Sequence, residues 1–284
     1  MEDTIECLES LKKITYPNYG VIVVDNGSEG NDVEVLREKF GDYIYLIEND
    51  KNYGFAAGNN IGIRKAMNRG ADYVLLLNND TVVAPDFLDE LIEVASGDAK
   101  NGITGPNVYY YDRPEKICGA GGFINYWAIT CPRRGSRQAH SAKSEDITEV
   151  DYIARCCMLI SRDVLLTIGS LDERLFFWYE DVDLCIRAAR HGFKILSIPK
   201  SKIWHKVSAT ADRTRQANLL TTYYVTKNRF ILMEKHWSRL QFASSILCYV
   251  ILLPKHFVSF LLHIRRWDIL KSYLRGLFDY LRRK

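Results

Sequence analysis

The first hundred residues alternate between unbroken apolar runs and segments in which apolar residues recur at helical spacing. The unbroken runs, typical of strands that a parallel sheet buries on both faces, occupy 21–24, 43–47 and 73–77. The helical spacing predicts helices at about 3–14, 32–40, 57–68 and 86–95. Because short links join these elements in strand–helix–strand order, we predict right-handed parallel crossovers and an α/β fold.

Two local signals refine this first half. Asp3 and Glu6 are spaced as a capping box, in which each side chain bonds the backbone at the start of the first helix. The loop 49–60 contains Gly54 and Gly58, and glycines let backbone N–H groups approach a ligand closely.

After Ile103 the regular alternation ends, and turns rich in Gly or Pro separate short apolar segments. Strands are predicted at 107–111, 122–127, 152–160 and 193–198, with Pro199 as a turn and a further apolar segment at 203–205. Helices are predicted at 162–168 and 180–192. Residues 131–149 are polar and without periodicity, which predicts a mobile loop over a binding site.

From residue 213 onward the pattern is helical. A helix at 213–237 is followed by the uncharged stretch 242–253, which Pro254 interrupts. Twelve residues are too few to span a bilayer, which needs about twenty. Residues 264–284 mix apolar and basic side chains at helical spacing, the pattern of a helix lying in a membrane interface. Packing of this helix on the rest of the chain is the alternative.

Charge supports a distinct role for the C-terminal segment. The 284 residues carry a net charge of +3, yet residues 241–284 alone contain eight Lys or Arg and two Asp. We therefore expect a membrane surface or another acidic partner there, and no nucleic acid. Seven cysteines without a C-x-x-C pair argue against a disulfide framework or a zinc site and suit a reducing cytosol. The N-terminal Met-Glu-Asp lacks the pattern of a signal peptide.

A first candidate site follows the apolar run 73–77, which stops at Asn78, Asn79 and Asp80. In open α/β sheets ligands bind at the carboxyl ends of strands. Asp80 is therefore a candidate to hold a hard cation and its phosphates. An ordinary turn that caps the following helix is the alternative.

A second candidate site lies in Phe176–Arg187, where aromatic residues lead into a helix opened by carboxylates. Carboxylates at a helix N-terminus are favoured by the helix dipole. Asp183 and Arg187 are spaced to form an ion pair on this helix, whereas Glu180 and Asp181 have no obvious partner.

These motifs, in this order, resemble glycosyltransferase family 2, inverting enzymes of GT-A fold, and most of all its rhamnosyltransferase-type branch. The matching segments are Asp3–Leu11, Asp25–Ser28, Asn52–Asn60, Leu77–Thr81, Leu171–Phe177, Glu180–Leu184, and His205 with Ser208. The resemblance implies a Rossmann-like, mostly parallel sheet flanked by helices. It also implies a nucleoside-diphosphate sugar as donor and a glycan or lipid-linked acceptor.

The resemblance gives roles to residues on the donor side. Asp25 would contact the base or ribose of the nucleotide, with a plain strand-end turn as the alternative. Gly54, Gly58 and Asn60 would form the loop beneath the nucleotide, with helix entry alone as the alternative.

The same resemblance implies a metal site. Asn78 and Asp80 stand where the family has its D-x-D motif, and Asn78 replaces a carboxylate of that motif. Asp80 and His205 would bind Mg²⁺ or Mn²⁺ together with the donor diphosphate. For His205 a structural role is the alternative.

On the acceptor side, Asp181 resembles the catalytic base that deprotonates the acceptor hydroxyl during inversion. Glu180 would bind acceptor hydroxyls, and Trp178 or Tyr179 would stack on a sugar ring. The alternative for Glu180 and Asp181 is an N-terminal helix cap.

Two departures from the family pattern stand out. The family's first strand is absent, so we expect two unpaired strand edges and weakened donor binding; a start codon assigned too far downstream or a truncation would explain it. Arg155 occupies a strand position where relatives carry a small, Gly-containing sequence, and it would contact the diphosphate or narrow the acceptor pocket.

Together these observations predict a GT-A domain at 1–212, with a nucleotide-binding half at about 1–102 and an acceptor and catalytic half at about 103–212. Residues 213–284 are predicted to form a basic membrane-associating tail. The expected function is transfer of a sugar, with rhamnose as the candidate that the family resemblance favours, in cell-envelope glycan synthesis at the inner, cytoplasmic face of the membrane. A non-catalytic GT-A-like binding module and a nucleotidyltransferase are the rival functions.

Overall fold

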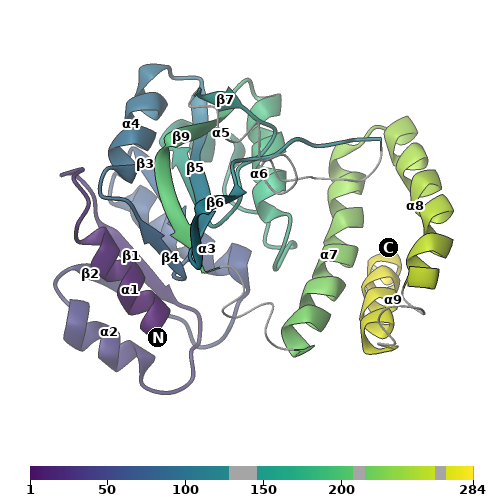
Figure 1. Ribbon diagram of the computed structural model, residues 1–284, viewed down its shortest axis with the longest axis horizontal. Coiled ribbons are helices and arrows are strands. Elements are labelled where there is room, and N and C mark those ends of the chain that lie inside the picture. Colours follow the sequence, from purple (N-terminus) through teal and green to yellow (C-terminus); the bar gives the residue numbers. More distant parts are fainter. Residues whose placement is uncertain (128–145, 207–214, 260–266, 284) are drawn as a thin grey trace. The chain divides into compact units, whose positions relative to one another are not determined.

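A computed structural model describes residues 1–127, 146–206, 215–259 and 267–283 (Figure 1). By its internal contacts the chain divides into two compact units. Unit 1 comprises residues 1–122 and 133–206, and unit 2 comprises residues 123–132 and 207–284. The predicted loop at 131–149 lies outside the described residues up to residue 145.

Unit 1 is built on a mixed seven-stranded sheet. Its central path runs β3 (Tyr73–Leu77), β8 (Cys157–Ser161), β5 (Asn101–Tyr110), β9 (Lys194–His205) and β4 (Thr81–Val83), with β6 (Arg113–Gly119) beside β5 and β7 (Thr148–Glu149) beside β9. Only β5 and β9 pair in parallel; the other ladders are antiparallel. The parallel crossovers that the sequence predicts therefore do not by themselves account for this sheet.

A second, two-stranded parallel sheet contains β1 (Val21–Asp25) and β2 (Ile44–Glu48), joined by α2 (Asp32–Phe40) as predicted. Within the described residues, β1 pairs only with β2 and β3 pairs only with β8, so each has one edge without a strand. The helix α3 (Phe55–Asn68) packs against both β1 and β3 and bridges the two sheets.

Helices cover the larger sheet. In Figure 1, α4 (Phe87–Gly97) lies on one side of β5 and β9, and α6 (Glu180–Arg190) lies on the other. The remaining helices of the unit are α1 (Glu2–Leu11) and α5 (Arg162–Ile168). The core side chains with at most 1% exposure include Phe87, Leu91, Ile103, Met158, Ile160, Leu184, Ile198 and Ile203. Burial of these apolar side chains fixes the strands whose ends form the site.

The start of α1 differs from the prediction. The helix begins at Glu2, and no side-chain cap is formed. Instead the carboxylates of Asp3 and Glu6 both bind the ammonium of Lys206, with 2.6 Å between Asp3 Oδ1 and Lys206 Nζ. The predicted capping box is wrong because a long-range cation attracts both carboxylates more strongly than the local backbone does.

Several strand boundaries also differ. The two predicted segments at 193–198 and 203–205 form one strand, β9, in which residues 199–201 have no partner on β5. This bulge accommodates Pro199, which has no N–H to donate. The predicted strand 122–127 does not form a strand; Gly122 makes an isolated bridge with Tyr152, and β8 begins only at Cys157. The strand β6 was not predicted, because its first four residues are exposed and show no apolar alternation.

Unit 2 contains three helices among its described residues: α7 (Arg215–His236), α8 (Arg239–Ser259) and α9 (Trp267–Arg282). The predicted interruption at Pro254 is wrong, because α8 continues through it. Phe230 of α7 stacks on Tyr280 of α9, with ring centroids 5.2 Å apart. A Cβ on Gly276 would lie only 2.6 Å from the Tyr223 carbonyl oxygen, so this glycine allows the two helices to approach closely.

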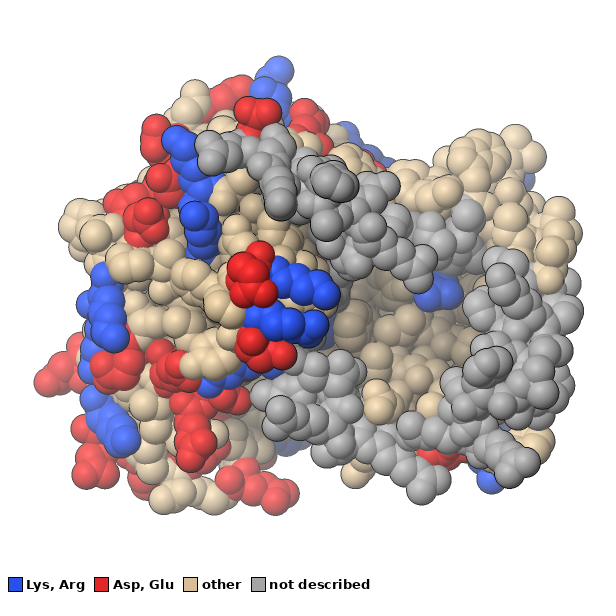
Figure 2. Space-filling view, viewed as in Figure 1, with Lys and Arg blue, Asp and Glu red and all other residues tan. Residues whose placement is uncertain are grey.

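The opposite face of α9 is apolar and exposed. It consists of Trp267, Leu274, Phe278 and Leu281, which are 49–65% exposed; we call it the α9 stripe. No helix in the described part of the chain combines the length and the apolar character that a membrane crossing requires. On the face of unit 1 drawn in Figure 2, acidic and basic side chains are interspersed, whereas the α9 segment belongs to the strongly basic end of the sequence.

Candidate active site

The corner between β3 and β4 brings Asp80 next to His205. Because β4 runs antiparallel to β9 with Thr81 opposite His205, the imidazole lies beside the residue before Thr81. His205 Nε2 is 3.0 Å from Asp80 Oδ1, and both side chains are about four-fifths buried. The Lys206 backbone N–H donates to the Asp80 carbonyl, so the end of β9 is fixed to the corner.

A short chain of hydrogen bonds joins this corner to Asp181. The Asn78 N–H extends the β3–β8 ladder by donating to the Cys156 carbonyl at 2.9 Å. The residue before Cys156, Arg155, donates its backbone N–H to Asp181 Oδ2 at 3.1 Å. Asp181 Oδ1 accepts from the Val182 N–H. Residues that are far apart in the sequence therefore meet at the end of β3.

Glu180 lies beneath Arg155. Its side chain is fully buried, and its Oε1 accepts from the Arg155 guanidinium at 3.1 Å. Its Oε2 has no hydrogen-bond partner in the described structure. Burial, and secondarily the charge of Asp181, raise the pKa of Glu180 to about 7, although the Arg155 charge acts in the opposite direction. The sequence had left Glu180 without a partner, and Arg155 is that partner.

Three aromatic rings enclose the Arg155 guanidinium. Its central carbon lies 4.1 Å from the Phe177 ring centroid, 4.5 Å from that of Trp178 and 4.9 Å from that of Phe55. Contacts of this kind stabilise a cation that is largely withdrawn from water. The predicted sugar-stacking residue Trp178 thus already has Arg155 over its ring.

The backbone before α6 is strained. Trp178 and Tyr179 have φ values of 79° and 73°, the only positive φ values of non-glycine residues in the described structure. Each such residue costs about 1–3 kcal/mol, and strain of this kind clusters at functional sites. The strained turn directs Trp178 toward Arg155 and begins the helix at Glu180 and Asp181.

The predicted donor loop is organised by Asn26, which the sequence analysis did not single out. Its side chain donates to Asn52 Oδ1 and the Gly54 carbonyl, and accepts from Asn49 and the Tyr53 N–H, all at 3.1–3.2 Å. The signal for it was the position of Asn26 between Asp25 and a glycine at a strand end. The neighbouring Asp25 accepts from two backbone N–H groups through one oxygen, Oδ2.

The glycines of this loop have packing roles. Gly54 has a φ of +88°, and a Cβ there would lie 2.4 Å from the Phe176 ring. The Phe55 N–H donates to the Phe176 carbonyl, so the loop is fastened to the aromatic segment. A Cβ on Gly58 would lie 3.1 Å from Asn26 Nδ2.

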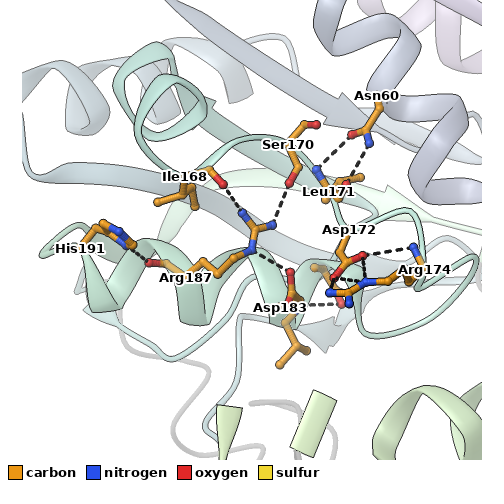
Figure 3. A network of polar contacts seen from close by, with 11 residues as sticks. Asn60, Ile168, Ser170, Leu171, Asp172, Arg174, Asp183, Arg187 and His191 are labelled. Carbon is orange, nitrogen blue, oxygen red and sulfur yellow. Dashed lines mark hydrogen bonds and ion pairs between the residues drawn. The ribbon is translucent and has the colours of Figure 1, made fainter. Parts of the chain in front are cut away.

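Asn60 is buried and supports the site from α3 (Figure 3). Its amide exchanges two hydrogen bonds with the Leu171 backbone and donates to Glu173. The predicted Asp183–Arg187 pair is confirmed at 2.8 Å, and the same guanidinium donates to the Ile168 and Ser170 carbonyls. These contacts fix the turn before the aromatic segment to α3 and α6.

The Asp80–His205 pair supplies two of the ligands that a divalent cation needs. A carboxylate oxygen and an imidazole nitrogen 3.0 Å apart are ligands that Mn²⁺ accepts. Within the described residues, no three His, Cys, Asp or Glu side chains gather closely enough to hold an ion by themselves. An ion held here therefore needs further oxygen ligands from phosphate or water.

The sequence matches a known protein family. The glycosyl transferase family 2 model matches residues 2–169, more than half of the chain. The chain therefore belongs to glycosyl transferase family 2.

Relatives and solved structures narrow the assignment. The dTDP-rhamnosyl transferase RfbF of Shigella flexneri is 26% identical over 77% of this chain and 72% of its own. The N-acetylglucosaminyl-diphospho-decaprenol L-rhamnosyltransferase of Mycobacterium tuberculosis is 24% identical over 81% and 79%. The mannosyltransferase PcManGT from Pyrobaculum calidifontis, solved with GDP-Man and Mn²⁺, has a TM-score of 0.61 at 14% identity, covering 99% of this chain and 83% of that one. The fold is thus GT-A, and the chain resembles the rhamnosyltransferase branch.

Proposed function

We propose that this protein is a metal-dependent, inverting glycosyltransferase of cell-envelope glycan synthesis. It transfers a sugar, with rhamnose as the first candidate, from a nucleoside-diphosphate sugar to a lipid-linked or polysaccharide acceptor. The observation that carries the proposal is the link from Asp80 and Asn78 through Cys156 and Arg155 to Asp181. It joins a candidate metal ligand to a candidate base.

In this proposal Asp181 is the general base. It takes the proton of the acceptor hydroxyl while that oxygen bonds to the anomeric carbon and the bond from this carbon to the diphosphate breaks. Two backbone N–H groups orient its carboxylate. The unpartnered Oε2 of Glu180 supports the role of this residue toward acceptor hydroxyls, and Trp178 contributes an aromatic wall.

Asp80 and His205 would hold Mg²⁺ or Mn²⁺ with the donor diphosphate. When bound, the cation would neutralise the charge that develops on the leaving diphosphate. Asp25 and the loop containing Gly54 and Gly58 would bind the nucleotide. Asn60 would act through the Leu171 turn, because its amide is already occupied there.

The first test is a panel of nucleotide sugars, including dTDP-rhamnose, UDP-GlcNAc and GDP-mannose, incubated with Mn²⁺ or Mg²⁺. We expect one donor to bind and to be slowly hydrolysed, and the Asp181→Asn variant to bind it without turnover. Wild-type protein that neither binds nor hydrolyses any donor contradicts the proposal. That result favours a non-catalytic GT-A-like module, which the two unpaired strand edges of β1 and β3 would suit.

Unit 2 supports a peripheral site of action at the inner face of the membrane. The inner face of α9 is used in packing on α7, through Gly276 and Tyr280. The α9 stripe faces outward, and the segment 241–284 that contains it carries six net positive charges. An apolar stripe on a basic helix matches an anionic lipid surface, where each Lys or Arg contributes about 1 kcal/mol.

Flotation with vesicles that contain anionic phosphatidylglycerol tests this part of the proposal. Phe278→Glu should lower vesicle binding about tenfold or more, because burial of a Phe side chain contributes about 1.5–3 kcal/mol. Leu166→Glu, the same kind of change at a 66% exposed position of unit 1, serves as the control and should leave binding unchanged. Equal binding by the Phe278 variant and the control would refute membrane docking through the α9 stripe.

A further inference from the structure

Arg155 has a charged side chain at the site to which the proposed function gives no role. The Arg155 side chain is 16% exposed; its guanidinium is enclosed by the rings of Phe55, Phe177 and Trp178 and pairs with the fully buried Glu180. Its own backbone N–H bonds Asp181. Glu180 and the aromatic rings thus hold the guanidinium, so it is not directed toward a diphosphate.

We infer that Arg155 is a positioning residue for Asp181: its side chain, held by Glu180 and the aromatic rings, fixes the backbone N–H that orients the Asp181 carboxylate. The inference rests on the proposed function, in which Asp181 is the base.

The geometric part of the argument concerns how firmly the N–H donor is held. Rings from the donor loop and from the strained aromatic turn surround the guanidinium, and Glu180 anchors one of its nitrogens. The Cys156 carbonyl, one residue further on, is fixed by Asn78. With both ends of this dipeptide held, the Arg155 N–H has little freedom to leave Asp181. Misplacement of a catalytic group by about 1 Å can cost about 100-fold in rate.

The electrostatic part concerns two adjacent carboxylates. Glu180 and Asp181 repel each other, and this repulsion favours keeping a proton on the buried Glu180. The charged groups that face Glu180 are Asp181 and Arg155. Further along α6, Asp183 pairs with Arg187. Arg155 is therefore the cation that opposes protonation of Glu180.

Among the described residues, the elements packed against α6 are β5, β9 and α5, and they supply no competing charge. The strand β5 has no charged residue. The charged residues of α5 and β9 are exposed or contact other groups: Arg162 (Met67 and Ala71 carbonyls), Lys194 (Asp98) and His205 (Asp80), with Asp163, Lys200 and Lys202 exposed.

The chain contains a matched control. Arg187 and Asp183 form a second ion pair with the same exposures, 16% for the arginine and 0% for the carboxylate. It holds α6 to the Ile168 and Ser170 carbonyls, and none of these hydrogen bonds involves Asp181. If Arg155 had a purely structural role, loss of Arg155 and loss of Arg187 should change stability, kcat and the pH profile in the same way.

The experiment compares Arg155→Met, Arg155→Lys and Arg187→Met in the full-length protein with the donor that the wild type uses. Initial rates of transfer, or of donor hydrolysis, are measured from acid to neutral pH, together with the KM for donor and the midpoint of urea unfolding. Arg155→Gln, which keeps a hydrogen-bond donor toward Glu180 but no charge, takes the place of Arg155→Met should that variant not fold.

We expect the charge-removing variant to lower kcat about 100-fold with the donor KM nearly unchanged. The acid limb of its pH–rate profile should move about one to three pH units upward, because Glu180 now retains its proton to higher pH. Arg155→Lys should keep the wild-type acid limb but not the full kcat, since an ammonium cannot stack as a planar fork. Arg187→Met should lose stability while its acid limb stays in place.

The inference is overturned if the charge-removing variant has the wild-type pH profile and loses no more kcat than Arg187→Met. The proposed function fails in a different way, through a wild-type protein that turns over no donor at any pH. That result overturns the inference as well.

Discussion

Gly54→Ala tests whether the donor loop and the aromatic segment are fitted to each other. Gly54 has φ of 88° and ψ of 173°, a region that is essentially restricted to glycine. A Cβ at this position would lie 2.4, 2.6 and 2.7 Å from three atoms of the Phe176 ring. The substitution therefore adds a steric clash to a backbone that already resists a side chain.

The magnitude follows from the two contributions. Backbone strain costs about 1–3 kcal/mol, and forcing a ring out of a packed position costs about 1–3 kcal/mol. We expect Gly54→Ala to lower the free energy of unfolding by about 2–6 kcal/mol. Gly70→Ala separates these contributions, because Gly70 has a φ of +80° but no atom within 4 Å of an added Cβ. Gly70→Ala should cost only the backbone strain, about 1–3 kcal/mol.

Urea unfolding of both variants provides the measurement, and donor affinity by calorimetry reports on the loop. Combining Gly54→Ala with Phe176→Ala should recover part of the stability that Gly54→Ala loses, because the clashing ring is gone. Equal losses for Gly54→Ala and Gly70→Ala, with no recovery in the double variant, would show that Phe176 does not rest on Gly54 as described.

Three further predictions concern charges around the site. Arg187→Met should lower the free energy of unfolding by about 3–5 kcal/mol, since it breaks a pair with the buried Asp183, whereas the exposed Arg190→Met should change it little; similar losses would refute the role of the pair. The pKa of Glu180 is raised from its ordinary value of 4.5 to about 7, so the folded state holds more protons in that window and its stability falls as pH rises through it. Denaturation at about pH 5 and about pH 7 should show this fall in the wild type and a smaller one in Glu180→Gln, and equal slopes would contradict it. His205→Ala should raise the Mn²⁺ concentration needed for half-maximal activity at least about tenfold; an unchanged requirement would remove His205 from the metal site.

The sequence predicts the elements whose boundaries depend on local pattern. The helices α2 and α5 occupy the predicted ranges, and α3 begins only two residues before its predicted start. The strand β3 matches its apolar run. The Asp183–Arg187 pair follows from helical spacing alone. In each of these, the interaction that fixes the element lies within a few residues along the chain.

Long-range contacts account for what the sequence could not predict. Lys206 binds Asp3 and Glu6 from about 200 residues away and replaces the expected cap. The pairing of β9 with β5 extends across Pro199, although a proline in isolation suggests a turn. Arg155 is identified from sequence only as a departure from the family pattern, because its partners come from three other segments.

In the candidate site, too, local motifs were predictable from the sequence and long-range contacts were not. The sequence assigns Asp80, Asp181 and His205 through motif order, and the ladders of β3 and β4 explain how the corner, the residue before β8 and the end of β9 come together. Asn60 was expected beneath the nucleotide, but its amide is bonded to the Leu171 turn. A side chain's bonding partners, unlike its position in a motif, depend on packing that periodicity does not encode.

The central claim is that Asp181 is the base of an inverting transfer. Its most direct test is the rate of sugar transfer by Asp181→Asn under donor saturation, with donor affinity measured separately and the anomeric configuration of the wild-type product determined by NMR. The account predicts an inverted product, an unchanged donor affinity, and a transfer rate lowered by about 10²–10⁴-fold in the variant. A retained anomeric configuration, or a variant that transfers sugar at nearly the wild-type rate, would contradict it.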